Sequence, residues 1–333
     1  MRHFWKSFTV PAVLVAILAA AAPSRATSCT MQAELLPQDR DALAAAGGRL
    51  AAAVAVQDIA TLKGALLPAI AQDWDGIRNE AEQAAPLLKG GQIQLRNLYL
   101  LDATTLSAPA DTQFFCSNAD GSLTVTLAMR ALPPGRYAVV LAEAAGAPYA
   151  GQLSFLLVWD GPASGWKLGG LTIRPGVLDG HDGLWWWTHA RELLRSDQNE
   201  SWPAWYSYET ARMLVLPVDF LSSPNLEKLI AEQEAIKNSP QNAFPLTLSE
   251  GPRSWKVDAV HIDPTLLHAD LAVVFESIGV TDPAAQRTEA IAVLSAFLKT
   301  QPELRKSFHG LWAYTVKDGK QTPVMELPMA QIP

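Results

Sequence analysis

The sequence predicts an α+β protein in which helices pack on one side of a curved antiparallel sheet. Three observations support this fold class. Residues 35–88 carry apolar side chains at helical spacing, residues 91–175 form successive strand-like runs separated by turn residues, and residues 182–237 become helical again. Helices followed by a meander of antiparallel strands are typical of the α+β class. A smaller α+β unit is expected at residues 250–333.

The first 26 residues have the composition of a secretory signal peptide. Arg2 and Lys6 precede an uncharged apolar core of about 14 residues, and small residues surround the expected cleavage point after Ala26. A core of this length is too short to span a bilayer as a helix. We therefore expect signal removal, no membrane insertion afterwards, and a periplasmic or secreted protein.

The charge of the chain excludes two classes of partner. Cleavage after Ala26 removes three basic residues and no acidic one, which changes the formal net charge from −7 to −10. Nucleic acids and anionic membranes are bound through clustered Lys and Arg side chains, and no such cluster occurs in the sequence. Neither is expected as a partner.

Cys29 and Cys116 are the only cysteines, and both lie in the part expected to be exported. In an oxidising compartment, a disulfide bond between them is the leading interpretation. Two alternatives stay open: a pair of buried thiols, or a lipid attached to Cys29 at the end of the tetrapeptide "ATSC".

Several helices and then six strands are expected in residues 27–177. Apolar side chains recur at helical spacing at Leu43, Leu50, Val54, Leu62, Leu66, Ile70 and Ile77, and Gly90-Gly91 ends this helical set. The strand-like runs are "GQIQLRNLYLLD", "DTQFFCSN", "SLTVTLAMR", "GRYAVVLAEA", "GQLSFLLVWD" and "GWKLGGLTIRP". Turn residues at 118–122 and 160–165 predict hairpin connections.

This order of elements, with "GWKLGGLTIRP" as a Trp-bearing last strand, resembles the NTF2-like (SnoaL-type) cone fold over residues 35–175. The resemblance implies a conical pocket between the sheet and the helices, which in different members is an enzyme site, a ligand site or an interaction surface. If polar groups act in that pocket, Arg96, Tyr99 and Asp102 on the first strand are the candidates for ligand binding.

Residues 178–240 are expected to form a tryptophan-rich helical hairpin that connects the two α+β units. With Asp182 as N-cap and about 100° per residue, an apolar arc forms from Trp186, Trp187, Ala190, Leu193 and Leu194. Trp185 projects away from this arc, with His189 one turn below it, and is a further candidate for ligand binding. The segments "WTHARELL" and "YETARMLV" echo each other, which predicts a crossing near Ala190 and Ala211.

The same stretch offers the best candidates for catalysis. His181, Asp182 and His189, with Asp179 nearby, combine imidazole and carboxylate groups that act as a base and its orienting acid in hydrolases and isomerases. Two histidines that bind zinc from one helix are usually four residues apart, whereas these are eight apart, so no metal and no cofactor are expected. His261, His268 and His309 are interpreted as isolated histidines.

The C-terminal unit, residues 250–333, combines strands with one well-marked helix. "SWKVDAVHID" and "ADLAVVFESIGV" have strand character, and the helix begins at Pro283 after the N-cap Asp282 and stops before Pro302. A closing hairpin is expected to turn at Asp318-Gly319.

No sequence motif identifies an enzyme class. The chain has no G-x-S-x-G, G-x-G-x-x-G, H-E-x-x-H or C-x-x-C motif and no phosphate-binding loop. The favoured function is therefore non-catalytic: an exported protein that binds a small or apolar ligand in a cone pocket or docks an envelope protein. The alternatives are a hydrolase or isomerase using His181, Asp182 and His189, and glycan binding through exposed tryptophans.

Overall fold

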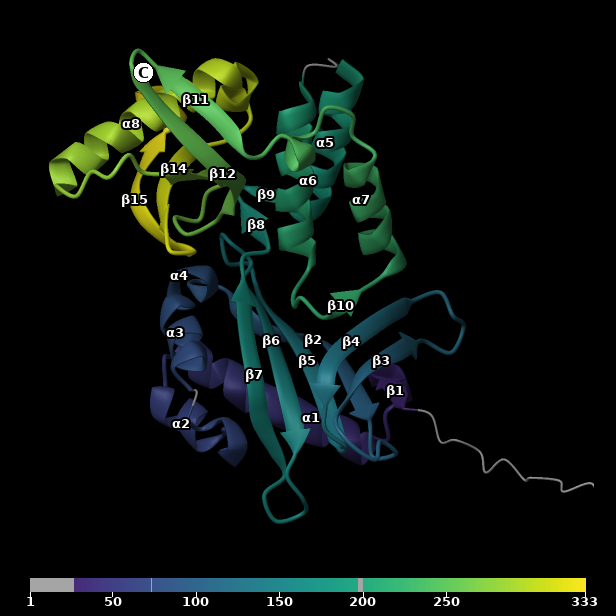
Figure 1. The fold of residues 1–333 in the computed structure, drawn as a ribbon. Helices are drawn as coiled ribbons and strands as arrows, with labels where there is room; N and C mark the ends of the chain where they lie inside the picture. The colour runs from purple at the N-terminus through teal and green to yellow at the C-terminus, as the bar shows by residue number, and fades with distance from the viewer. Residues whose placement is uncertain (1–26, 73, 197–199) are drawn as a thin grey trace, which may run out of the picture.

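The computed structural model describes residues 27–72, 74–196 and 200–333, so the expected signal peptide lies outside the described residues. The chain has the predicted α+β class, with helices and largely antiparallel sheets (Figure 1). Among the described residues, each helix is too short or too polar to cross a membrane.

A five-stranded antiparallel sheet in the order β1-β2-β5-β6-β7 forms the centre of the N-terminal part. Its strands are β1 (Ser28–Met31), β2 (Gln92–Asp102), β5 (Arg136–Ala145), β6 (Gln152–Trp159) and β7 (Trp166–Arg174). One face is covered by α1 (Pro37–Ala55), α2 (Ile59–Gly64), α3 (Asp75–Gln83) and α4 (Ala85–Leu88) (Figure 1). Short 3-10 turns lie at Gln32–Glu34 and Pro68–Ile70.

The expected single meander is wrong in one respect, because two of its strands leave the central sheet. β3 (Ala110–Ser117) and β4 (Thr124–Leu132) form a second sheet with β10 (Leu221–Ser222), a strand from beyond the N-terminal part. Alternate residues of β3 and β4 are buried, whereas six consecutive residues of β5 are buried. A strand buried on both faces needs a layer on each side, and the β3-β4 hairpin supplies the second layer.

Two separate apolar cores follow from this layering. Leu98 on β2 packs with the helices in one core, and its neighbour Tyr99 packs with β3 and β4 in the other. Successive side chains of a strand point to opposite faces, so adjacent residues of β2 serve different cores. The space between helices and sheet is occupied by the first of these cores.

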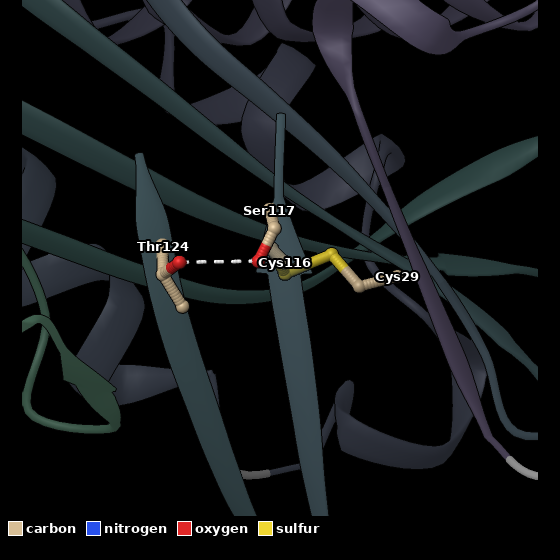
Figure 2. The surroundings of a disulfide bond; sticks show 4 residues. All are labelled: Cys29, Cys116, Ser117 and Thr124. Atoms are coloured by element: carbon tan, nitrogen blue, oxygen red, sulfur yellow. Dashed lines mark hydrogen bonds between the residues drawn. A yellow bond between two sulfur atoms is a disulfide. The ribbon is translucent and has the colours of Figure 1, made fainter. Parts of the chain in front are cut away.

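The predicted disulfide bond is present between Cys29 and Cys116. It joins β1, at the edge of the central sheet, to β3 of the second sheet across a Cα–Cα distance of 5.1 Å (Figure 2). Beside it, Ser117 Oγ and Thr124 Oγ1 lie 3.1 Å apart and connect β3 to β4. The bond therefore fastens the two sheets to each other.

The described helices of the connector meet at a half-buried ion pair. α5 (Gly183–Ser196), α6 (Ser201–Val215) and α7 (Pro224–Glu234) follow a small hairpin of β8 (Val177–Leu178) and β9 (His181–Asp182). Arg191 of α5 donates two hydrogen bonds to Glu232 of α7, at 2.7 and 2.8 Å. The Trp187 indole and the Tyr208 hydroxyl donate to the same carboxylate. The Arg191 hydrogen bonds are the main reason that the pKa of Glu232 falls to about 2.

A second five-stranded sheet forms the C-terminal part, in the order β11-β12-β13-β14-β15. Its elements are β11 (Leu246–Glu250), β12 (Arg253–Asp263), β13 (Asp270–Glu276), α8 (Pro283–Thr300), β14 (Gly310–Lys317) and β15 (Lys320–Pro328), with 3-10 turns at Pro240–Asn242, Pro302–Lys306 and Met329–Gln331. The predicted α8, its Asp282 cap and the hairpin turn are confirmed. β11 begins before residue 250, the expected start of this unit, and β13 and β14 run parallel.

The connector and the C-terminal sheet share one apolar core. Trp186, Trp202 and Trp205 of the connector belong to the same buried cluster as Trp255 and Phe297 of the C-terminal part. Ala190 and Ala211 are fully buried in it, as the predicted helix crossing requires. The three helices are thus packed into the C-terminal unit rather than suspended between two domains.

Candidate functional site

The structure brings His181, Trp185 and His189 into one aromatic stack. The ring centroids of His181 and Trp185 lie 3.5 Å apart with nearly parallel planes, and those of Trp185 and His189 lie 4.7 Å apart. Trp185 is 39% exposed, as its predicted position outside the apolar arc requires. Partial burial lowers the pKa of His189. The His189 imidazole is therefore held against an indole at the protein surface.

The carboxylates expected to orient these histidines form hydrogen bonds with other groups. Asp182 Oδ1 accepts a hydrogen bond of 2.8 Å from the Trp185 backbone N–H, which is the predicted N-cap role. Asp179 lies 2.6 Å from a ring nitrogen of His268 and also accepts from the Ala269 backbone. The arrangement of a base with its orienting acid is therefore not formed by these residues, and their use in catalysis stays a prediction.

The candidates on β2 are engaged in structural contacts. Tyr99 is buried between the two sheets, on the face away from the helices, so the expectation that it points into a pocket between sheet and helices is wrong. Arg96 donates two hydrogen bonds of 2.9 Å to Glu143 on the neighbouring strand. Asp102 accepts from the backbone N–H and the hydroxyl of Thr104.

A groove of about 870 Å³ lies at the second sheet, in a place the sequence did not indicate. Residues of β3, β4, β6 and the chain leading into β10 line it, and its lining is mainly apolar. The lining residues are Asp111, Thr112, Gln113, Ala128, Met129, Arg130, Leu132, Leu156, Asp219, Phe220, Leu221 and Ser222. The connector borders the groove, and the Ala128 N–H donates to the Phe220 carbonyl oxygen at 2.8 Å.

The three charged side chains that line the groove differ in their partners. Asp219 is paired with Arg174 at 2.8 Å, and Asp111 accepts a hydrogen bond from the Ala131 backbone. Arg130 is exposed and makes no hydrogen bond or ion pair within the described part of the chain. The groove thus combines apolar walls with two charges that have no ion-pair partner among the described residues, the Arg130 guanidinium and the Asp111 carboxylate.

A second cluster gathers where the β8-β9 turn meets the start of β13 and β14. The imidazoles of His268 and His309 are stacked, with ring centroids 3.7 Å apart and an interplanar angle of 11°. Each bonds a carboxylate: His268 contacts Asp179, and His309 Nδ1 lies 3.0 Å from Asp270 Oδ1. The interpretation of His268 and His309 as isolated histidines is therefore wrong.

Two carboxylates meet beside this histidine pair. Asp270 is fully buried, and Glu326 on β15 is half-buried. Burial raises the pKa of both groups, and for Glu326 the neighbouring charge of Asp270 adds to the effect. Asp270 Oδ2 and Glu326 Oε1 are buried without a hydrogen-bond partner among the described residues, as is Nε1 of Trp312, which faces Glu326 across the strands.

A further titratable group lies in a cleft of about 390 Å³ where β7, α6 and β12 meet. Glu209 of α6 lines this cleft with Arg212, Arg174 and His261. Burial raises the pKa of Glu209 to about 7, although the charge of Arg212 opposes the shift. Burial also lowers the pKa of His261.

Glu209→Gln should change how the stability of the protein depends on pH. The folded-state pKa of about 7 lies above the ordinary value of 4.5, so the folded chain keeps a proton that the unfolded chain releases. This stabilisation is complete below about pH 4.5 and is lost as the pH rises through about 7. Urea denaturation should show the wild-type free energy of unfolding falling by about 1–2 kcal/mol relative to E209Q between pH 5 and pH 8. Parallel profiles of the two proteins would contradict the assignment.

No protein-family model, curated protein or solved structure matches this chain.

Proposed function

We propose that this chain is an exported binding protein that holds a small ligand, with an apolar body and an acidic head, in the groove at the second sheet. The single observation that carries the proposal is the groove of about 870 Å³ with its mainly apolar lining. Ligand pockets typically enclose about 300–1,000 Å³ and combine apolar walls with few polar groups. The dimensions of the groove lie in this range.

The acidic head is inferred from Arg130. Its guanidinium lines the groove and has no hydrogen-bond or ion-pair partner within the described residues, whereas Asp219 is held by Arg174 and Asp111 accepts from the Ala131 backbone N–H. A guanidinium binds a carboxylate through two parallel hydrogen bonds. Met129, Leu132 and Leu156 would contact the apolar body.

Export is supported by the disulfide bond. Stable disulfides form in oxidising compartments such as the periplasm or the extracellular space, and this chain links Cys29 to Cys116. The NTF2-like resemblance is compatible with a binding role, although the groove lies on the opposite face of the central sheet from the helices.

Native mass spectrometry of the protein isolated from its own host's envelope tests the proposal. The wild type should carry an additional mass that is lost on denaturation. Ala128→Trp places a large side chain in the groove from an exposed position and should abolish that mass. Phe115→Trp is the matched control, because Phe115 is exposed on the same sheet but does not line the groove. A bare wild-type polypeptide, or a ligand that Ala128→Trp retains, would overturn the proposal.

A further inference from the structure

We propose that Asp270, His309 and Glu326 form a binding site for a divalent transition-metal ion, with zinc the best match to the ligand types. One ring nitrogen of His309 and one oxygen of each carboxylate lie within 4.8 Å of one another. Imidazole nitrogen and carboxylate oxygen are both common zinc ligands. The sequence did not indicate this site, because the three residues are far apart along the chain.

Burial of unpartnered oxygens is the observation that points to a cation. Asp270 is 0% exposed, and its Oδ2 has no hydrogen-bond partner among the described residues. Oε1 of Glu326 is also buried and also has no hydrogen-bond partner among the described residues. Buried carboxylate oxygens are almost always paired in folded proteins, and two adjacent carboxylates repel each other. A metal ion bound to both oxygens satisfies them and removes the repulsion.

Gly310 leaves room for the two carboxylates. Leu271 pairs with Leu311 in the parallel β13-β14 ladder, which places Asp270 beside Gly310. A β-carbon at position 310 would collide with Glu326 Oε1 and would lie 3.0 Å from Asp270 Oδ1. Any other residue at this position would therefore push the carboxylates away from their present places.

The histidine pair provides both orientation and access. His309 is held by its stacking on His268, and His268 is held in turn by Asp179. Partners of this second layer fix the ring of a metal-binding histidine. The side chain of His309 is 34% exposed, so an ion can approach from solvent. Bonds from zinc to its ligands are about 2.1 Å long. A small inward movement of the Glu326 side chain, on the edge strand β15, would bring its oxygen to this distance from an ion held by Asp270 and His309.

Zinc titration of the metal-free mature protein, followed by calorimetry and native mass spectrometry, tests this site. We expect one zinc ion per chain in the wild type and a loss of affinity of at least about tenfold in Glu326→Gln. Glu276→Gln is the matched control, because Glu276 is an exposed carboxylate on the same strand as Asp270. It should bind zinc as the wild type does. Glu326→Gln replaces the carboxylate by an uncharged amide of nearly the same size on an edge strand, so a folded variant is expected, and circular dichroism checks this.

Two outcomes would overturn the proposal. Absence of zinc binding by the wild type would mean that a shared proton, rather than a metal, neutralises the two carboxylates. Binding that survives Glu326→Gln but is lost in His181→Ala would place the metal at the Trp185 stack instead. Neither result depends on the groove, which lies at the other sheet.

Discussion

Replacing both Cys29 and Cys116 by alanine should lower the free energy of unfolding by about 4 kcal/mol. The two residues are 87 positions apart, so their bond restricts a long loop in the unfolded chain. The bond also fastens β1 to β3 and so holds the second sheet against the central one. Alanine is preferred to serine because Cys116 is fully buried and a hydroxyl there would lack a partner.

Urea denaturation followed by circular dichroism measures this loss. The wild type treated with a reducing agent should approach the stability of the double variant, and the double variant itself should not respond to the reductant. A difference of less than about 1 kcal/mol between oxidised wild type and double variant would show that the two sheets are held together by their apolar core alone.

Glu289→Ala should lower the free energy of unfolding by about 3 kcal/mol. The Glu289 carboxylate is 3% exposed and accepts three hydrogen bonds, from Trp255 Nε1 at 3.0 Å, Ser277 Oγ at 2.7 Å and the Ile278 backbone N–H at 2.8 Å. These contacts join α8 to β12 and to the segment after β13. Removal of the carboxylate leaves three donors without an acceptor, which costs more than the hydrogen bonds themselves contributed.

Two variants on the same helix sharpen this test. Glu289→Gln keeps the shape and one acceptor oxygen but turns an amide group toward a donor, so an intermediate loss of about 1–2 kcal/mol is expected. Thr288→Ala is the control, because Thr288 is exposed, and its loss should stay within about 0.5 kcal/mol. Equal stability of wild type and Glu289→Ala in urea denaturation would contradict the assigned role.

Features encoded by neighbouring residues were predictable from the sequence. The Asp282 cap of α8 and the Asp182 cap of α5 depend on a side chain and a backbone N–H three residues later, and both are confirmed. Helical spacing correctly separated buried Trp186 and Ala190 from exposed Trp185. The disulfide followed from the presence of only two cysteines.

Features that join distant segments were not predictable in the same way. The groove needs β10 to pair with β4, and these strands are separated by the whole of α5 and α6. The cluster around His309 needs β13 and β14 to be parallel neighbours, so that the starts of both strands meet at one edge of the sheet. A strand, a helix and a second strand in succession are the sequence signal for such a parallel pair. Applied to residues 270–317, this signal would have placed Asp270 beside His309.

The two-residue strand β10 determines where the chain can be cut to give an N-terminal fragment with covered strand edges. Residue 177 is the natural cut from the sequence, but a fragment ending there would lose Leu221 and Ser222 and expose the backbone edge of β4. Unpaired strand edges recruit other chains and promote aggregation. We expect residues 27–177 alone to self-associate through β4, whereas a fragment extended to residue 223 would keep that edge covered. By covering the edge of β4, the connector therefore protects the N-terminal part from aggregation through that strand.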